Sequence, residues 1–323
     1  MAPRRPLNKH QTKSSDSATY NSSRRVPRNC IDILSTGIKK VKVNSTTRGS
    51  NSKTNARHIN LEDVRLWENF VTLEDVETIW NENRRLMEIM SRPMTEEERS
   101  RMMHGEPITG ANVSEIELEA HIRARIQWPL NLIFHICAKD LQAAGQPMLG
   151  DGQSATWIPK KAKKAAKSAK RMRPDYAGFY LASNNPDFAK GQTDQIFNRI
   201  PGDAKCYRKI HREMLPPNGI YYLEKKYKNE AQKVLDQIHA YMDSRETRYG
   251  YIINDKELIF LRRCGTGWGH LDISPSIPHE PEDRNGPNSL QVLFYFHWKL
   301  AHQDKCGDWW LKSFAGEPDK IRD

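Results

Sequence analysis

The amino-acid sequence predicts an α/β protein, in which an α+β mixed sheet is flanked by helices and preceded by a disordered basic arm. Segments with helical periodicity precede, interrupt and follow short aromatic segments that have strand character. The length of 323 residues suffices for one large domain. Residues 1–57 hold thirteen Lys or Arg and two acidic residues, so this segment carries the whole net charge of +11.

The first two segments are expected to lie outside the main domain. Residues 1–57 are rich in Ser, Thr and Asn and bury too little apolar surface to offset the loss of chain entropy, so we expect a disordered arm. Between residues 60 and 103, apolar side chains recur three and four positions apart, which predicts two amphipathic helices. We assign residues 58–109 to this helical collar, which either completes the core or binds a partner.

The main domain is expected to span residues 110–304 and to begin with a helix near Ser114. Glu117 makes a capping box with Ser114, and an apolar stripe follows at helical spacing. Pro129 is expected to kink this helix. Glu119 falls on the apolar stripe, where a carboxylate needs a partner, either in a salt bridge or in a metal-linked site.

The rest of the domain is predicted from short strand-like and helical segments. In chain order these are a strand at 175–181, a loop at 182–198, a strand at 200–207 entered through a Pro-Gly turn, an apolar piece at 220–223, a helix at 229–241, a hairpin of 249–253 and 257–261, and a helix at 290–302. Residues 305–323 are expected to form a C-terminal tail. This order of elements is typical of a mixed sheet flanked by helices.

Three charged residues form the candidate site. Side chains alternate along a strand, so Asp203 and Lys205 share one face of their strand. Asp175 opens the neighbouring strand, and paired strand ends would bring two carboxylates beside an ammonium group. Two carboxylates suit magnesium, and the lysine can orient or deprotonate an attacking water while the metal neutralises developing negative charge. These groups match the hydrolysis of a phosphodiester.

The strings RPDYAGFYL, IPGDAK and RYGYIINDKELIFLR resemble the PD-(D/E)XK nuclease superfamily, and more narrowly the PD-(D/E)XK nuclease-like domains of a group of fungal proteins. The resemblance covers residues 110–304 and implies a restriction-endonuclease-like core. It implies that Asp175 and Asp203 bind Mg²⁺ or Mn²⁺ and that Lys205 is the catalytic lysine.

The same resemblance implies roles for three further residues. Glu119 would be the optional helix glutamate of the superfamily. Gln237 and Tyr241 match the QxxxY pattern of its RecB-like branch, which lies beside the site near the nucleic acid. Simpler interpretations stay open, because Glu119 also suits a salt bridge and the other two also suit the packing of one helix face.

A second triplet competes with Asp203-Ala204-Lys205. Glu224-Lys225-Lys226 also follows a strand-like run and is the alternative if residues 200–207 do not form a strand. We prefer the first triplet because Asp203 follows Asp175 by 28 residues, whereas Glu224 follows it by 49, and because the Pro-Gly turn gives the strand of Asp203 a defined start.

A basic insertion at residues 159–173 precedes the candidate site and contains eight Lys or Arg and no acidic residue. Such a run favours a polyanionic partner, since each bound phosphate releases counterions. Its candidate nucleic-acid contacts are Lys160, Lys161, Lys163, Lys164, Arg171 and Arg173. DNA is favoured over RNA as the partner, and a solvated charged helix is the alternative interpretation.

The sequence leaves three functions open. A Mg²⁺-dependent nuclease is preferred, a nuclease-like module that binds nucleic acid or protein without cutting is the alternative, and a kinase-associated or regulatory domain is the third. A kinase itself is disfavoured because no Gly-rich phosphate loop and no HRD or DFG triplet occurs. No apolar run approaches the roughly 18 residues of a membrane span and no apolar stretch follows the N-terminal charges, so we expect a nuclear or cytoplasmic protein without a membrane partner.

Overall fold

The structure is a computed structural model of the chain. It describes residues 27–38, 58–103, 115–143, 145–151, 174–182, 198–207, 210–215, 225–265, 267–280, 286–301 and 308–313.

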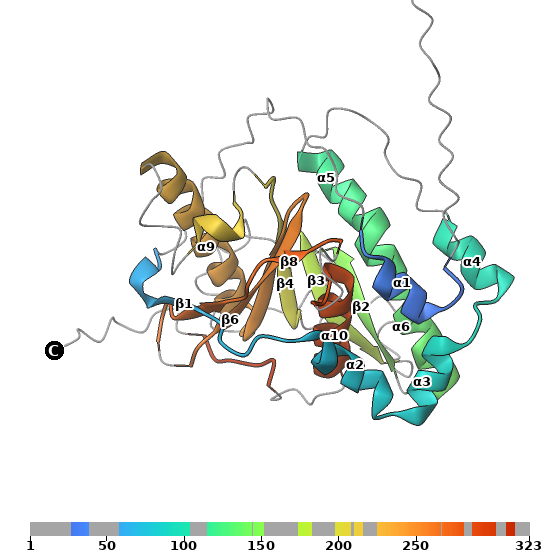
Figure 1. The fold of residues 1–323 in the computed structure, drawn as a ribbon. Helices are drawn as coiled ribbons and strands as arrows, with labels where there is room; N and C mark the ends of the chain where they lie inside the picture. Colours follow the sequence, from blue (N-terminus) through green and yellow to red (C-terminus); the bar gives the residue numbers. More distant parts are fainter. Residues whose placement is uncertain are drawn as a thin grey trace, which may run out of the picture.

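An eight-stranded mixed sheet runs through the centre of the molecule (Figure 1). Its strands are β1 (Val64–Leu66), β2 (Gly145–Asp151), β3 (Tyr176–Ala182), β4 (Ile200–Ala204), β5 (Tyr249–Ile253), β6 (Glu257–Arg263), β7 (Leu271–Ile273) and β8 (Ile277–Pro278). The strand order is β1-β7-β6-β5-β4-β3-β2, and β8 pairs with β6. The β1–β7 and β4–β5 pairs are parallel, whereas the other pairs are antiparallel.

Helices cover both faces of this sheet. They are α1 (Cys30–Thr36), α2 (Leu73–Asn81), α3 (Arg84–Ser91), α4 (Glu96–Met103), α5 (Glu115–Ile122), α6 (Trp128–Leu141), α9 (Lys225–Ser244) and α10 (Ser289–Ala301). Figure 1 shows α9 on one side of the sheet and α1, α6 and α10 on the other. Each side has its own apolar cluster. Leu235 and Ile238 of α9 belong to one with Ile252, while Phe296 of α10 stacks on Phe260 in the other. The prediction of a mixed sheet flanked by helices is therefore confirmed.

Several predicted elements occur where the sequence placed them. Strands β3 and β4 cover most of the two predicted strands, and β5 and β6 form the predicted antiparallel hairpin. Helix α9 contains the helix predicted at 229–241, and α10 covers all but the last residue of the helix predicted at 290–302. Among the helices of the described ranges, none is both long and apolar enough to cross a membrane. The predicted loop at 182–198 and the apolar piece at 220–223 lie mostly or wholly outside the described residues.

The Pro-Gly pair before Asp203 is not a turn, and that prediction is wrong. Pro201 and Gly202 lie inside β4, where they pair with Ala177 and Tyr176 of β3. Glycine is required here for space: a Cβ atom on Gly202 would lie 2.1 Å from Cζ of Tyr251. The aromatic ring of the neighbouring strand thus occupies the volume that any larger residue would need.

Pro129 does not produce a simple kink. Residues Arg123–Gln127 form a π-helical turn that joins α5 to α6, and Pro129 lies in the first turn of α6. A proline lacks the N–H that an interior helical position donates, and the wider π turn removes the need for that donor.

Part of the segment expected to be a disordered arm is ordered. Residues 27–38 form α1 and its flanks, and Cys30, Leu34 and Ile38 are buried in the apolar cluster beneath α10. Nδ2 of Asn288 donates a hydrogen bond of 2.7 Å to the carbonyl oxygen of Leu34, which fixes the segment. The short apolar patch therefore belongs to the core, and the rest of residues 1–57 lies outside the described residues.

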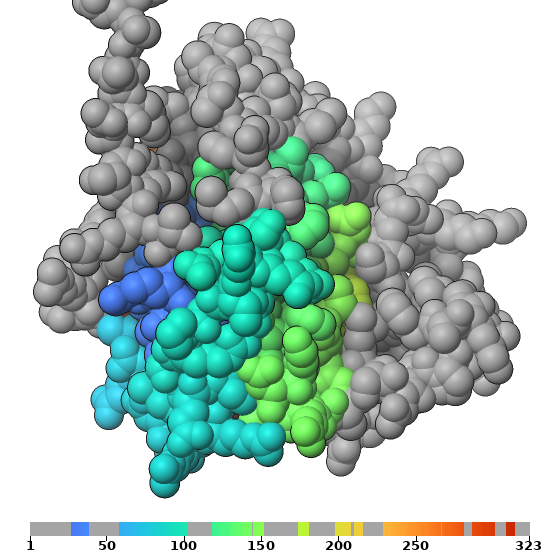
Figure 2. Space-filling model, turned by 90° about the vertical axis from the view of Figure 1, so that its right-hand side faces the viewer, coloured from blue at the N-terminus to red at the C-terminus, as the bar shows by residue number. Residues whose placement is uncertain are grey.

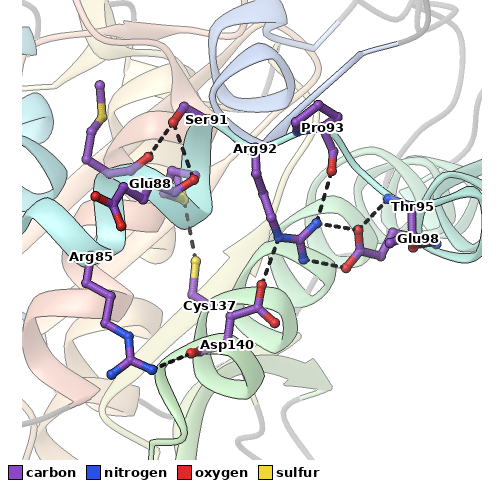
Figure 3. A network of polar contacts seen from close by, with 11 residues as sticks. Arg85, Glu88, Ser91, Arg92, Pro93, Thr95, Glu98, Cys137 and Asp140 are labelled. Atoms are coloured by element: carbon purple, nitrogen blue, oxygen red, sulfur yellow. Dashed lines mark hydrogen bonds and ion pairs between the residues drawn. The ribbon is translucent and has the colours of Figure 1, made fainter.

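In its described part, residues 58–103, the collar contains three α-helices and strand β1 rather than two helices, and it is joined to the main domain. Figure 2 shows α1, the collar and the α5–α6 region side by side on one surface. The guanidinium of Arg92 in the collar lies 2.7 Å from Glu98 and 2.8 Å from Asp140 of α6 (Figure 3). Its hydrogen bonds lower the pKa of Glu98 to about 2, so this pair is charged over the physiological range, and the second contact of Arg92, with Asp140, joins the collar to α6.

His297, in α10, makes the stability of the fold pH-dependent. Its ring packs on Gly178 of β3, and burial lowers the pKa of His297 from 6.5 to about 4. The native imidazole stays neutral between these values while the unfolded chain takes up a proton. We therefore expect this histidine to contribute roughly 3 kcal/mol of stability above pH 6.5 that is lost as the pH falls to 4.

The check is urea denaturation between pH 7.5 and 4.5 of the native chain and of His297→Leu. The variant should lack this part of the acid-induced loss, whereas His135→Leu, at an exposed position of α6, should retain it. Parallel stability curves for the native chain and His297→Leu would contradict the assignment.

Candidate active site

The pairing of β3 with β4 places two aspartates opposite each other. Tyr176 pairs with Gly202, so the antiparallel register brings position 175 beside position 203. Asp175 lies directly before β3, and its Oδ2 accepts a hydrogen bond of 2.8 Å from the backbone N–H of Ala204. This bond fixes the Asp175 carboxylate at the end of β4.

Lys205 completes the group on the same face. Its Nζ lies 2.6 Å from Oδ2 of Asp203, and its backbone N–H donates to the carbonyl oxygen of Ile253 at 2.9 Å. The second bond continues the β4–β5 pairing past the last residue of β4. Asp203 is 0% exposed and Lys205 is 9% exposed, so the contact between the two side chains is almost fully withdrawn from water.

Burial and a second negative charge perturb the acid of the site. Burial raises the pKa of Asp203 from 3.8 to about 8; the ammonium of Lys205 opposes this shift, and the charge of Asp175 adds to it. The close approach of two carboxyl groups in a poorly hydrated position has this effect because both cannot be ionised without a compensating cation. Strong perturbation of this kind is typical of functional sites.

Helix α9 covers the site with two polar side chains. Nε2 of Gln237 donates a hydrogen bond of 2.5 Å to the hydroxyl oxygen of Tyr241, and both side chains are buried. Burial raises the pKa of Tyr241, and the charge of Asp203 contributes to the shift. The two residues predicted from the QxxxY pattern therefore lie on the helix face that is directed toward the aspartates.

Glu119 is placed elsewhere. Its carboxylate lies 3.8 Å from the guanidinium of Arg123, which also lies 3.3 Å from Asp151 of β2. Its backbone oxygen accepts a hydrogen bond from the hydroxyl group of Tyr176, whose side chain lies on the face opposite to Asp175. The structure thus gives Glu119 a salt bridge, the first of the two kinds of partner considered from the sequence, and does not bring it together with the two aspartates.

The aspartate pair suits a hard divalent cation that keeps most of its water. Among the described residues, no group of three or more His, Cys, Asp or Glu side chains is arranged to hold a metal ion. Mg²⁺ is commonly held by only one or two carboxylates plus water and substrate oxygens. The ammonium of Lys205 contacts one carboxyl oxygen of Asp203, and Asp175 lies close enough to the same carboxyl group to raise its pKa. Asp175 and Asp203 would together hold the cation.

The competing triplet is not on a strand. Lys225 and Lys226 begin helix α9, whereas Asp203 lies in β4 with Lys205 directly after it. The condition that favoured the alternative is therefore not met. Glu224 lies outside the described residues, as do all the basic insertion contacts: Lys160, Lys161, Lys163, Lys164, Arg171 and Arg173.

Tyr251 supports the site and was not among the candidates from the sequence. Its ring is 1% exposed, fills the space above Gly202 and stacks on Tyr176 at 6.3 Å between ring centroids. The ring therefore limits how closely the β4 backbone that carries Asp203 can approach Tyr251. The glycine of the string IPGDAK was the available signal, since a strand glycine marks a close approach of another group.

Comparisons of the chain with protein-family models, with curated proteins and with solved structures found no match.

Proposed function

We propose that this protein is a Mg²⁺-dependent nuclease that hydrolyses phosphodiester bonds of DNA. The observation that carries the proposal is the convergence of Asp175, Asp203 and Lys205 on one buried face of the sheet. Two carboxylates and an ammonium group at one point are the parts required for metal-assisted attack of water on a phosphodiester.

Each residue has a distinct task in this proposal. Asp175 and Asp203 hold the cation, which supplies Lewis-acid stabilisation of the negative charge that develops on phosphate oxygens. Lys205 orients the attacking water or takes its proton, and its ammonium form stabilises the phosphorane-like transition state. Gln237 and Tyr241 close the site from α9 and exclude bulk water, which strengthens each of these electrostatic interactions.

The order of elements supports a restriction-endonuclease-like core. The helix that bears Glu119 is followed by β3 directly after Asp175, by β4 with Asp203, and by α9 with Gln237 and Tyr241. This is the order that the resemblance to PD-(D/E)XK nucleases implies. The basic segments at 1–57 and 159–173 support DNA as the partner and a nuclear or cytoplasmic location.

The proposal is tested by incubating the purified full chain with supercoiled plasmid and Mg²⁺ or Mn²⁺. Nicking should require the metal and should be lost in Asp203→Ala. The matched control is Asp272→Ala, which removes an aspartate of β7 that is ion-paired with Arg262 at the other side of the sheet. Nicking that survives in Asp203→Ala would overturn the assignment.

A module that binds without cutting is the second candidate. The observation that favours it is the placement of Glu119 beside Arg123, which leaves two carboxylates rather than three in the site. Under this alternative the protein would bind DNA equally well with and without divalent metal and would not cut DNA with any divalent metal. The plasmid assay therefore separates the two candidates.

The basic arm is expected to contribute sequence-independent affinity. Residues 1–26 contain six Lys or Arg and one acidic residue, and they end before α1. Removing them should weaken DNA binding and flatten its dependence on salt, because each lost phosphate contact lowers the slope of log K against log salt by about 0.9. The comparison is a salt titration of binding by fluorescence anisotropy; an unchanged slope would show that the arm does not contact DNA. Deletion of residues 1–57 would instead remove α1 from the core.

A further inference from the structure

An aromatic cluster lies directly beyond the candidate active site. Tyr207 follows Lys205 by two residues, so their Cα atoms lie within about 7 Å of each other. The backbone N–H of Tyr207 donates a hydrogen bond of 2.7 Å to Oδ1 of Asp255, in the turn between β5 and β6. The position of Tyr207 relative to the site is therefore fixed by the same strands that carry Asp203.

The two faces of the Tyr207 ring are covered by different groups. The imidazole of His211 stacks on the ring, with 4.5 Å between centroids and 17° between planes. Nζ of Lys256 lies 3.8 Å from the ring centroid. A stacked ring leaves no room for an ammonium on its own side, so Lys256 occupies the opposite face.

This cluster is not part of the hydrophobic core. Neither Tyr207 nor His211 belongs to the apolar clusters formed by the described residues, and both are partly exposed. Lys256 is exposed and makes no ion pair with the residues that the structure describes. A long, exposed side chain therefore covers a flat aromatic face and is free to swing away from it.

Basic residues outnumber acidic ones along the chain next to the ring. The string KCYRKIHRE at residues 205–213 contains four Lys or Arg and one acidic residue, Glu213, which is exposed and lies 3.8 Å from the imidazole of His211. The charges of Glu257, Glu213 and Asp255 add to the effect of burial in raising the pKa of Tyr207, but the two carboxylates that flank Lys256 are themselves buried. Asp255 accepts from the N–H of Tyr207, and Glu257 accepts from the N–H of Arg212 at 2.8 Å.

We propose that the Tyr207 ring is a stacking platform for an unpaired base, so that the substrate of the site is single-stranded nucleic acid or an unpaired strand end. The base would stack on the face that Lys256 covers, and the ammonium would move to a neighbouring phosphate. Aromatic stacking is sequence-tolerant and contributes to single-strand binding at each base. A base inside a duplex is stacked on both sides and could not use this platform without leaving the helix.

The spacing agrees with this arrangement. Successive nucleotides are about 3.4 Å apart along the axis of a stacked helix and further apart in an extended, unpaired strand, so about 7 Å corresponds to one or two nucleotides. A base on Tyr207 would then place a phosphodiester one or two nucleotides away beside Lys205 and the aspartates. This inference rests on the proposed nuclease function and defines the strand form on which it acts.

The test measures binding of the full chain to a labelled single-stranded oligonucleotide and to the duplex of the same sequence, without divalent metal. Tyr207→Ala and Tyr207→Leu should each weaken single-strand binding roughly 10-fold, because leucine keeps the bulk but has no aromatic face. Tyr207→Phe should bind like the native chain. Duplex affinity should be unchanged in all three variants.

The matched control is Tyr295→Ala on α10. Tyr295 also has a lysine over its ring, since Nζ of Lys299 lies 5.1 Å from its centroid, but it lies on the opposite face of the sheet from the site. Its replacement should not change binding. Single-strand affinity that is equal in Tyr207→Leu and the native chain, or that falls as much for duplex as for single strand, would overturn the platform. If the protein nicks DNA in a metal-dependent way but single-strand affinity is unaltered in Tyr207→Leu, the platform alone is overturned. Absence of all binding would overturn the nuclease proposal as well.

Discussion

Asp203→Asn is expected to abolish metal-dependent cleavage and, at the same time, to stabilise the metal-free protein at alkaline pH. The loss of cleavage should be at least about 100-fold, because the neutral amide cannot replace a carboxylate that holds the cation and compensates Lys205. The gain in stability follows from burial, since Asp203 is 0% exposed and has its pKa raised to about 8.

The sign of the pH dependence is fixed by proton uptake. Between pH 4 and pH 8 the native Asp203 keeps a proton that the unfolded chain has lost, so the native chain loses stability as the pH rises through this window. The amide of the variant does not titrate, and the difference between variant and native chain should grow up to pH 8. The amide also leaves the ammonium of Lys205 without the charge of Asp203, which reduces the gain, so we expect a difference on the order of 2 kcal/mol at pH 9.

Thermal unfolding at pH 5, 7 and 9 measures this difference. Asp272→Asn is the control, since Asp272 is ion-paired with Arg262 near the surface and its replacement should give no gain at any pH. An Asp203→Asn variant that is less stable than the native chain at pH 9, or one that still cleaves, would contradict the assignment of a strained, functional carboxylate.

Gly202→Ala is expected to cost on the order of 4 kcal/mol or more, which for most domains is a large part of the total stability. The added Cβ would lie 2.1 Å from the Tyr251 ring, which is 1% exposed and stacked between Tyr176 and Phe260. Cleavage should be lost too, because Asp203 is the next residue.

A double variant separates this clash from other effects. Tyr251→Leu removes the ring atoms that meet the new methyl group, so Gly202→Ala should cost less in that background than in the native chain. Gly286→Ala is the matched control, since no heavy atom lies within 4 Å of its added Cβ. Urea denaturation of the four variants gives the coupling directly; equal costs of Gly202→Ala in both backgrounds would show that Tyr251 is not the cause.

Alternation along strands allowed most of the site to be predicted from the sequence. Asp203 and Lys205 are two residues apart, and this spacing alone requires a common face once β4 forms. The contact with Asp175 depended on the pairing register of β3 with β4, which the sequence could only suggest. The role of Glu119 depended on a helix orientation that no local pattern encodes, and its ion pair with Arg123 became visible only in three dimensions.

The parts of the fold that were not predicted have weak local signals. Strand β2 has the sequence GQPMLGD, in which two glycines and a proline are typical of a turn, and its strand form comes from pairing with β3 along seven residues. Helix α1 lies within a basic, polar segment and is held by burial of Cys30 and Leu34 against distant elements. Tertiary contacts decided both cases against local propensity.

The account depends most directly on one cation held between Asp175 and Asp203. Anomalous diffraction from crystals of the full chain soaked in Mn²⁺ would measure its position. We expect one strong anomalous peak with a carboxylate oxygen of each aspartate within about 2.2 Å, the distance typical of small divalent ions with oxygen ligands, and no such peak in Asp203→Asn crystals. A peak at other residues, or a site that stays empty in the native chain at saturating Mn²⁺, would contradict the central claim.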